Sequence, residues 1–202
     1  MPGDRPALAD RRDLKTVYQP AEDSKLLADA AVPYVDAGDW VLDVGTGSGY
    51  VAHRFLEETD ARVVGSDINP NACRQARNAG IPVVRADQLT PFRDGAFDVV
   101  VFNPPYLPTA PDREWNDWME KALSGGETGR EVIEPFLDDL RRVLDTGGDA
   151  FLLVSSLTGI DAVREHARAS GLTTMEVAEE PQPYERLVVL HLRPSGGPDA
   201  VR

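Results

Sequence analysis

Short segments of apolar, β-forming residues alternate with amphipathic helical segments along most of this chain of 202 residues. Because two parallel strands need a long crossover connection, usually a helix, this alternation predicts a mostly parallel sheet with helices on both faces. The sequence therefore predicts an α/β fold with a doubly wound, Rossmann-like sheet of seven strands, closed at one edge by an antiparallel strand. The expected strands are residues 40–44, 62–66, 81–85, 97–102, 150–154, 173–178 and 187–192.

Five segments have the spacing of apolar residues that is typical of helices with one buried face. The first begins near Pro20, and its early acidic residues suit a helix N-terminus. Asn69 and Pro70 suit the cap and the first position of another helix. The helices after the first are expected at residues 50–58, 69–79, 130–144 and 160–169.

The chain is long enough for one complete α/β domain and too short for two. Its two ends lack strand or helix periodicity, so we expect a flexible arm at residues 1–16 and a flexible tail at residues 194–202. One domain then occupies residues 17–193. The connection at residues 107–128 carries prolines, glycines and tryptophans, and connections of this length are usually functional or mobile.

No segment approaches the roughly 20 apolar residues needed to cross a bilayer, and the N-terminus is polar and charged, unlike a signal peptide. We therefore expect a soluble, cytoplasmic protein without a membrane partner. The single cysteine, Cys73, excludes an internal disulfide and cannot by itself form a metal site. No metal centre is expected.

The chain is strongly acidic, with 34 acidic and 21 basic residues and a formal charge of −13. A surface of this sign repels phosphate backbones, so tight binding to nucleic acid is not expected. A second interpretation is a halophilic one, because proteins of very salty cytoplasm carry acidic, lysine-poor surfaces whatever their function. Lys15, Lys25 and Lys121 are the only lysines, and we favour this environmental interpretation.

Four polar side chains fall at the carboxyl ends of four successive expected strands: Asp43, Asp67, Asp87 and Asn103. The carboxyl ends of parallel strands lie at one edge of a sheet, and ligands of such sheets bind beyond that edge. These four residues are therefore expected to meet at one site. The alternative is that the aspartates are only part of an acidic surface.

The fourth strand ends in Asn103, Pro104, Pro105 and Tyr106. Asn103 offers an amide acceptor and an amide donor, and the two prolines have no N–H to compete for acceptors. A planar NH2 group could donate to these oxygens while it stacks on the Tyr106 ring. A proline-rich turn with no ligand is the simpler alternative.

A glycine-rich turn, Gly45 to Gly49, joins the first strand to a helix. Tyr50 stands where the dinucleotide-binding pattern Gly-x-Gly-x-x-Gly needs its third glycine, and no Gly-Lys-Ser/Thr of a P-loop follows. The turn is therefore neither a dehydrogenase fingerprint nor a P-loop. Its helix N-terminus still offers free N–H groups that favour a carboxylate.

The strand-end residues have the chemistry to hold an adenosine that carries an amino acid. Asp67 could accept two hydrogen bonds from a ribose diol, and such charge-assisted bonds contribute about 1.5 to 3 kcal/mol. Asp87 and Gln88 could bind the adenine amino group and a ring nitrogen, and Asp43 suits a cationic amino group. This combination points to S-adenosylmethionine as cofactor.

The motifs together resemble the HemK-type glutamine N5-methyltransferases, which are class I S-adenosylmethionine-dependent methyltransferases. Three segments carry the resemblance: Val41 to Gly49, Ser66 to Pro70, and Asn103 to Tyr106. Two more, Tyr18 to Ser24 and Gly125 to Val132, resemble the short eukaryotic and archaeal branch. The resemblance covers roughly residues 17–192, with Gln19 and Gln88 at positions where the family usually has Glu and Leu.

The resemblance implies that the substrate is the glutamine of the Gly-Gly-Gln loop of a translation termination factor. Its target nitrogen would meet the segment from Asn103 to Tyr106. A small zinc-binding activator subunit is also implied, and strand 81–85, as a sheet edge with apolar Val83 and Val84, could pair with it. The cofactor contacts implied or argued from the residues are Ser24, Asp43, Gly45, Gly47, Gly49, Asp67, Asp87, Gln88 and Asn103.

Other functions fit part of the same chemistry. Adenine N6 of DNA or RNA is also a planar NH2 group that an Asn-Pro-Pro-Tyr segment could serve after base flipping, although no basic patch is evident. A protein lysine amine is a further candidate substrate. A non-catalytic S-adenosylmethionine-binding scaffold would keep the cofactor site without methyl transfer. The alternative to an activator on edge strand 81–85 is that the chain's own helices cover this strand.

Overall fold

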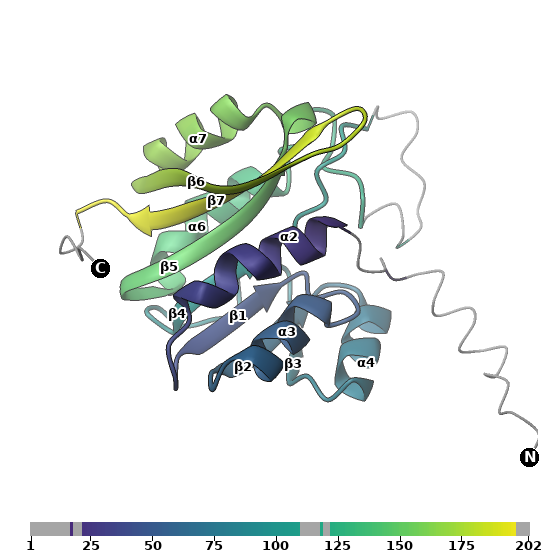
Figure 1. Cartoon of the computed structure of the whole chain (residues 1–202), viewed down its shortest axis with the longest axis vertical. Helices are drawn as coiled ribbons and strands as arrows, with labels where there is room; N and C mark the ends of the chain where they lie inside the picture. Colours follow the sequence, from purple (N-terminus) through teal and green to yellow (C-terminus); the bar gives the residue numbers. More distant parts are fainter. Residues whose placement is uncertain (1–16, 18–21, 110–117, 119–121, 197–202) are drawn as a thin grey trace, which may run out of the picture.

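The computed structural model describes residues 17, 22–109, 118 and 122–196. The expected arm and most of the expected tail lie outside this part of the chain, as do two pieces of the long connection after residue 107. The predicted α/β architecture is confirmed: helices cover both faces of one sheet (Figure 1).

The sheet has seven strands in the order β3-β2-β1-β4-β5-β7-β6. Strands β1 to β5 pair in parallel, and β7 is antiparallel to both β5 and β6. The strand order reverses between β1 and β4, which is where such sheets bind ligands. The strands are β1 Trp40–Val44, β2 Arg62–Asp67, β3 Val83–Arg85, β4 Phe97–Phe102, β5 Leu144–Ser155, β6 Leu172–Pro181 and β7 Arg186–Pro194.

Two hydrophobic cores lie on the two faces of the sheet. One contains apolar residues of α2, α3 and α4, and the other contains residues of α6 and α7. Successive residues of β1 serve the two cores in turn, with Val41 on the first side and Leu42 on the second, as strand geometry requires. The helices are α2 Glu22–Ala31, α3 Tyr50–Glu58, α4 Pro70–Asn78, α6 Ile133–Val143 and α7 Ile160–Ala169, with 3-10 turns η1 Val32–Tyr34 and η3 Ser156–Thr158.

Several predicted boundaries differ from the structure. Helix α6 begins at Ile133 rather than at residue 130, because Gly129 adopts a left-handed φ of 74° and ends the preceding turn. Strand β5 begins at Leu144 rather than at residue 150: Leu144 pairs with Phe97 across a bulge, and the polar Gly-Gly segment between hid this strand from the sequence pattern. Strand β3 covers only the second half of the expected segment.

Strand β3 forms one edge of the sheet, as predicted, and β6 forms the other. Helix α4 packs against β3, and Val84 on this strand is still 40% exposed. Within the described residues, no helix is both long and apolar enough to span a membrane.

Candidate active site

A cavity of about 650 Å³ lies beyond the carboxyl ends of strands β1 to β4, which is within the usual size of a cofactor site. The predicted residues Ser24, Asp43, Gly45, Gly47, Asp67, Asp87, Gln88, Asn103 and Pro105 all line it. The structure thus brings together side chains that are up to 81 positions apart in the sequence, from Ser24 to Pro105.

The glycine turn that leaves β1 is held against the end of β2. Thr46 N donates to Ser66 O at 2.8 Å, and Gly47 N donates to Asp67 Oδ2 at 2.9 Å. Gly49 is not part of the cavity lining: it precedes α3 with a φ of 89°, and a Cβ there would lie 3.1 Å from Ile81. Its role in the structure is therefore to let α3 pack closely against its neighbours.

Asp43 is 2% exposed and organises the glycine turn. Its Oδ2 accepts hydrogen bonds from Thr46 Oγ1 at 2.7 Å and from Ala52 N at 3.1 Å. Burial raises the pKa of Asp43 to about 7, against these two hydrogen bonds, which lower it. A nearby positive charge would stabilise the ionised form.

Asp67 stands at the end of β2 with both carboxylate oxygens held by backbone amides. Oδ2 accepts from Gly47 N at 2.9 Å, and Oδ1 accepts from Asn69 N at 2.8 Å. Burial raises the pKa of this carboxyl group, while the backbone hydrogen bonds act in the opposite direction. Each oxygen has a second lone pair, so this rigidly held carboxylate can still receive a diol.

Asp87 and Gln88 follow β3 in different ways. Asp87 is exposed at the cavity, whereas the Gln88 side chain is fixed, because its Nε2 donates to Val132 O at 3.0 Å. Gln88 also has a positive φ of 47°, which is unusual for a residue other than glycine. The carboxamide of Gln88 therefore joins the β3 end of the cavity to the segment before α6.

Asn103 lies between the large cavity and a second, small one of about 30 Å³. Its Nδ2 donates to Ser24 Oγ at 3.3 Å, which fixes the orientation of the amide. Its Oδ1 is buried, and no residue in the described part of the chain donates to it. A buried acceptor without a donor is costly, so this oxygen is suited to an N–H group that a ligand brings.

The small cavity is lined by the other residues of the predicted substrate segment, Pro104, Pro105 and Tyr106, and by Asp23. Burial raises the pKa of the Tyr106 phenol, and the negative charges of Glu185 and Asp23 raise it further. The phenol is therefore neutral at physiological pH. Tyr106 can act through its ring and its O–H, but not as a general base.

Sequence reasoning missed several residues of the cavity wall. Ile68, which directly follows Asp67, is half exposed and lines the cavity; an apolar residue next to a strand-end carboxylate was a signal that could have found it. Phe102, Trp118, Glu131 and Val132 also line the cavity. The last three come from the segment before α6. Glu131 and Val132 end the motif from Gly125 to Val132, which was the signal that could have found them, whereas no local pattern marks Trp118.

This fold and this cavity are those of a class I S-adenosylmethionine-dependent methyltransferase. A family model described as a methyltransferase domain matches residues 41–125. A protein of Methanocaldococcus jannaschii that is named as a protein N5-glutamine methyltransferase is 35% identical over 181 residues, which cover 87% of this chain and 90% of the relative. The chain therefore belongs to the protein N5-glutamine methyltransferase family.

Two further relatives agree with this assignment. The human methyltransferase HEMK2 is 30% identical over 189 residues, with 86% of this chain and 88% of the relative covered. Among solved structures, the Mtq2–Trm112 complex of E. cuniculi, described as responsible for the methylation of the eRF1 translation termination factor, gives a TM-score of 0.75 at 30% identity. The match covers 89% of this chain and 99% of the solved chain.

Proposed function

We propose that this chain methylates the side-chain amide nitrogen, N5, of the glutamine in the Gly-Gly-Gln loop of a translation termination factor. The relatives support the substrate class, since one is described as acting on such a factor. The observation that carries the proposal is Asn103 Oδ1, a buried acceptor that lacks a donor among the described residues. A glutamine NH2 group supplies the missing donor.

An amide nitrogen is a weak nucleophile, because its lone pair is delocalised into the carbonyl group. S-adenosylmethionine supplies an electrophilic methyl group, so the chain's task is to align the amide and polarise it. Asn103 Oδ1 accepts one N–H of the target, and Pro104 and Pro105 add carbonyl acceptors without competing N–H groups. The Tyr106 ring provides the surface on which the planar amide stacks.

The cofactor contacts follow from the cavity lining. The free lone pairs of the fixed Asp67 carboxylate accept hydrogen bonds from the ribose diol. The exposed carboxylate of Asp87 accepts one from the adenine amino group. Because the side chain of Gln88 is bound to Val132, Gln88 contributes its backbone to the adenine. Asp43, held by Thr46 and Ala52 through one oxygen, offers the other to the cationic amino group.

The remaining cofactor contacts are made by small groups. Gly45 and Gly47 line the cavity and let the cofactor approach the backbone closely. The N-terminus of α3 after Gly49 favours the carboxylate of the methionine part. Ser24 acts through Asn103, whose amide it holds at 3.3 Å.

A small activator subunit pairs with edge strand β3 in this proposal. The related E. cuniculi enzyme is a complex with a second chain, Trm112. Strand β3 is at the sheet edge, where the described part of the chain adds no further strand, and Val84 is 40% exposed there. Such an edge is a template for strand addition. We also propose a cytoplasmic location, because a translation factor as substrate would be met there.

The direct test offers labelled S-adenosylmethionine and the activator with one of three polymers: a termination factor, unmethylated DNA, or a lysine-bearing protein. We expect label only in the termination factor, and none when its Gly-Gly-Gln glutamine is replaced. Label in DNA would support the adenine-N6 alternative, and label in lysine would support the lysine alternative. Cofactor binding without methyl transfer to any of the three polymers would support the scaffold interpretation.

A further inference from the structure

We propose that Arg130 is a positioning residue for methyl transfer: it holds the segment that follows Asn103 in place through the loop of residues 123–131. This inference rests on the proposed function, since it concerns the same site. Neither Arg130 nor the residues that accept hydrogen bonds from its side chain, Thr128, Glu134 and Thr158, line the two cavities. Its effect on the reaction is therefore indirect.

The 123–131 loop pairs with the chain that leaves the Asn-Pro-Pro-Tyr segment. Leu107 N donates to Leu123 O at 3.0 Å, and Gly125 N donates to Leu107 O at 3.0 Å. Two residues further on, Thr109 N donates to Gly126 O at 2.9 Å. The position of residues 107–109, and with it the direction of the Tyr106 backbone, depends on where this loop lies.

Three glycines allow the loop to come this close. A Cβ at Gly129 would lie 2.6 Å from Tyr106 O and 2.7 Å from Thr158 Cγ2. A Cβ at Gly125 would lie 2.5 Å from Gly129 O, and one at Gly126 would collide with the carboxylate of Glu131. A side chain at Gly129 would therefore push the loop away from Tyr106, whereas a side chain at Gly125 or Gly126 would distort the loop itself.

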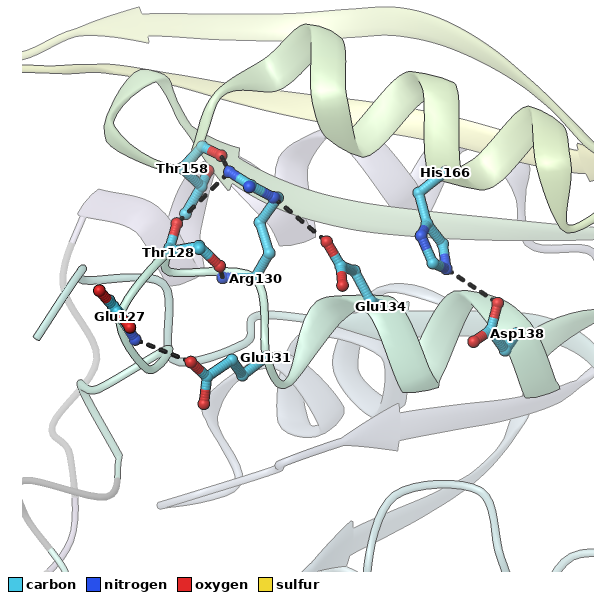
Figure 2. A network of polar contacts seen from close by, with 8 residues as sticks. All are labelled: Glu127, Thr128, Arg130, Glu131, Glu134, Asp138, Thr158 and His166. Atoms are coloured by element: carbon cyan, nitrogen blue, oxygen red, sulfur yellow. Dashed lines mark hydrogen bonds and ion pairs between the residues drawn. The ribbon is translucent and has the colours of Figure 1, made fainter. Parts of the chain in front are cut away.

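Arg130 fastens this loop to the end of the sheet (Figure 2). Its Nη1 donates to Thr158 O at 2.6 Å, and its Nε donates to Glu134 Oε1 at 3.2 Å. Thr158 is fully buried in η3, directly after β5. The guanidinium thus links the loop, the first turn of α6 and the end of β5. It can do so because its planar group carries several N–H donors that reach separate acceptors at the same time.

The same loop forms part of the cavity wall, since Ser124, Gly126 and Glu131 line the large cavity. Glu131 is fixed from within the loop, because Glu127 N donates to its Oε1 at 2.9 Å (Figure 2). Without the Arg130 side chain these local contacts remain, but the loop as a whole loses its hydrogen bond to Thr158 at the end of β5. We therefore expect displacement of the Tyr106 segment rather than loss of the fold.

The kinetic test compares Arg130→Ala and Arg130→Lys with the matched control Arg168→Ala, which removes an exposed arginine of α7. Arg130→Ala should lower kcat about 10- to 100-fold, the scale of a small misplacement of reacting groups, with cofactor Kd changed less than about threefold. Lysine, which reaches only one acceptor, should restore part of kcat, and ethylguanidine should restore part of it in Arg130→Ala. Arg168→Ala should behave like the wild type.

Gly129→Ala disturbs the same segment, because its Cβ would clash with Tyr106 O and Thr158. Its effect on kcat and that of Arg130→Ala should therefore be less than additive in the double variant. Wild-type kcat in Arg130→Ala would overturn the inference, as would equal losses of kcat and of cofactor affinity. Backbone hydrogen exchange gives a readout that needs no substrate: the amides of Leu107, Thr109 and Gly125 should exchange faster in Arg130→Ala, with β1 and β4 unchanged. Unchanged exchange at those amides would overturn the inference even if the proposed substrate is wrong.

Discussion

Asp67 permits the sharpest prediction about the cofactor. Its two carboxylate oxygens already accept hydrogen bonds from Gly47 N and Asn69 N at 2.9 and 2.8 Å, so the carboxylate both fixes the glycine turn and faces the cavity. Removing a charge-assisted acceptor for the ribose diol costs about 1.5 to 3 kcal/mol, which is roughly a 10- to 150-fold rise in Kd. Asp67→Asn should show this rise for S-adenosylhomocysteine in isothermal titration calorimetry.

Asp67→Ala should be worse than Asp67→Asn, because alanine also leaves the two backbone amides without their acceptor. Asp161→Asn is the control, since it removes an exposed carboxylate in the first turn of α7, outside the cavity lining. Its Kd should equal that of the wild type. If Asp67→Asn binds S-adenosylhomocysteine as tightly as the wild type does, the ribose assignment is wrong.

Three further predictions follow from the geometry of the site and of the sheet edge. Because burial raises the pKa of Asp43 from 3.8 to about 7, its contribution to the free energy of unfolding should fall by about 3 kcal/mol as pH rises from 4 to 7. Urea melts should show a flatter pH dependence of this free energy in Asp43→Asn, and identical slopes would contradict burial as the cause. Gly65→Ala places a Cβ 2.9 Å from Thr46 Oγ1 and should destabilise the chain by about 1 to 3 kcal/mol, seen as a lower Tm, whereas an unchanged Tm would show that Thr46 moves freely. Val84→Glu should abolish co-purification with the activator and leave cofactor Kd unchanged; undiminished co-purification would remove β3 as its site.

The sheet and the rim of polar residues could be predicted from the sequence because both follow from local patterns. Period-2 and period-3.6 spacing identify strands and helices, and parallel strands necessarily bring their carboxyl ends to one edge. Asp43, Asp67, Asp87 and Asn103 each lie within two residues of the carboxyl end of such a strand. Their meeting at one cavity therefore needed no tertiary information.

Contacts between distant segments could not be predicted in this way. The side chain of Gln88 is bound to Val132, 44 positions later, and the tethering of the 123–131 loop by Arg130 depends on Thr158, 28 positions later. Local rules also missed the start of β5, where Gly147 and Gly148 disfavour a strand, because pairing of Leu144 with Phe97 decides it. These features are consequences of packing, which sequence periodicity does not contain.

If Asn103 aligns the target amide, its removal should slow methyl transfer and leave the cofactor bound. Single-turnover methyl transfer to the termination factor, compared with cofactor affinity in the same Asn103→Ala variant, tests it most directly. We expect a rate constant lowered by about 10² to 10³, with cofactor Kd nearly unchanged. Equal losses of rate and cofactor affinity would contradict it, since Asn103 would then only support the fold of the site.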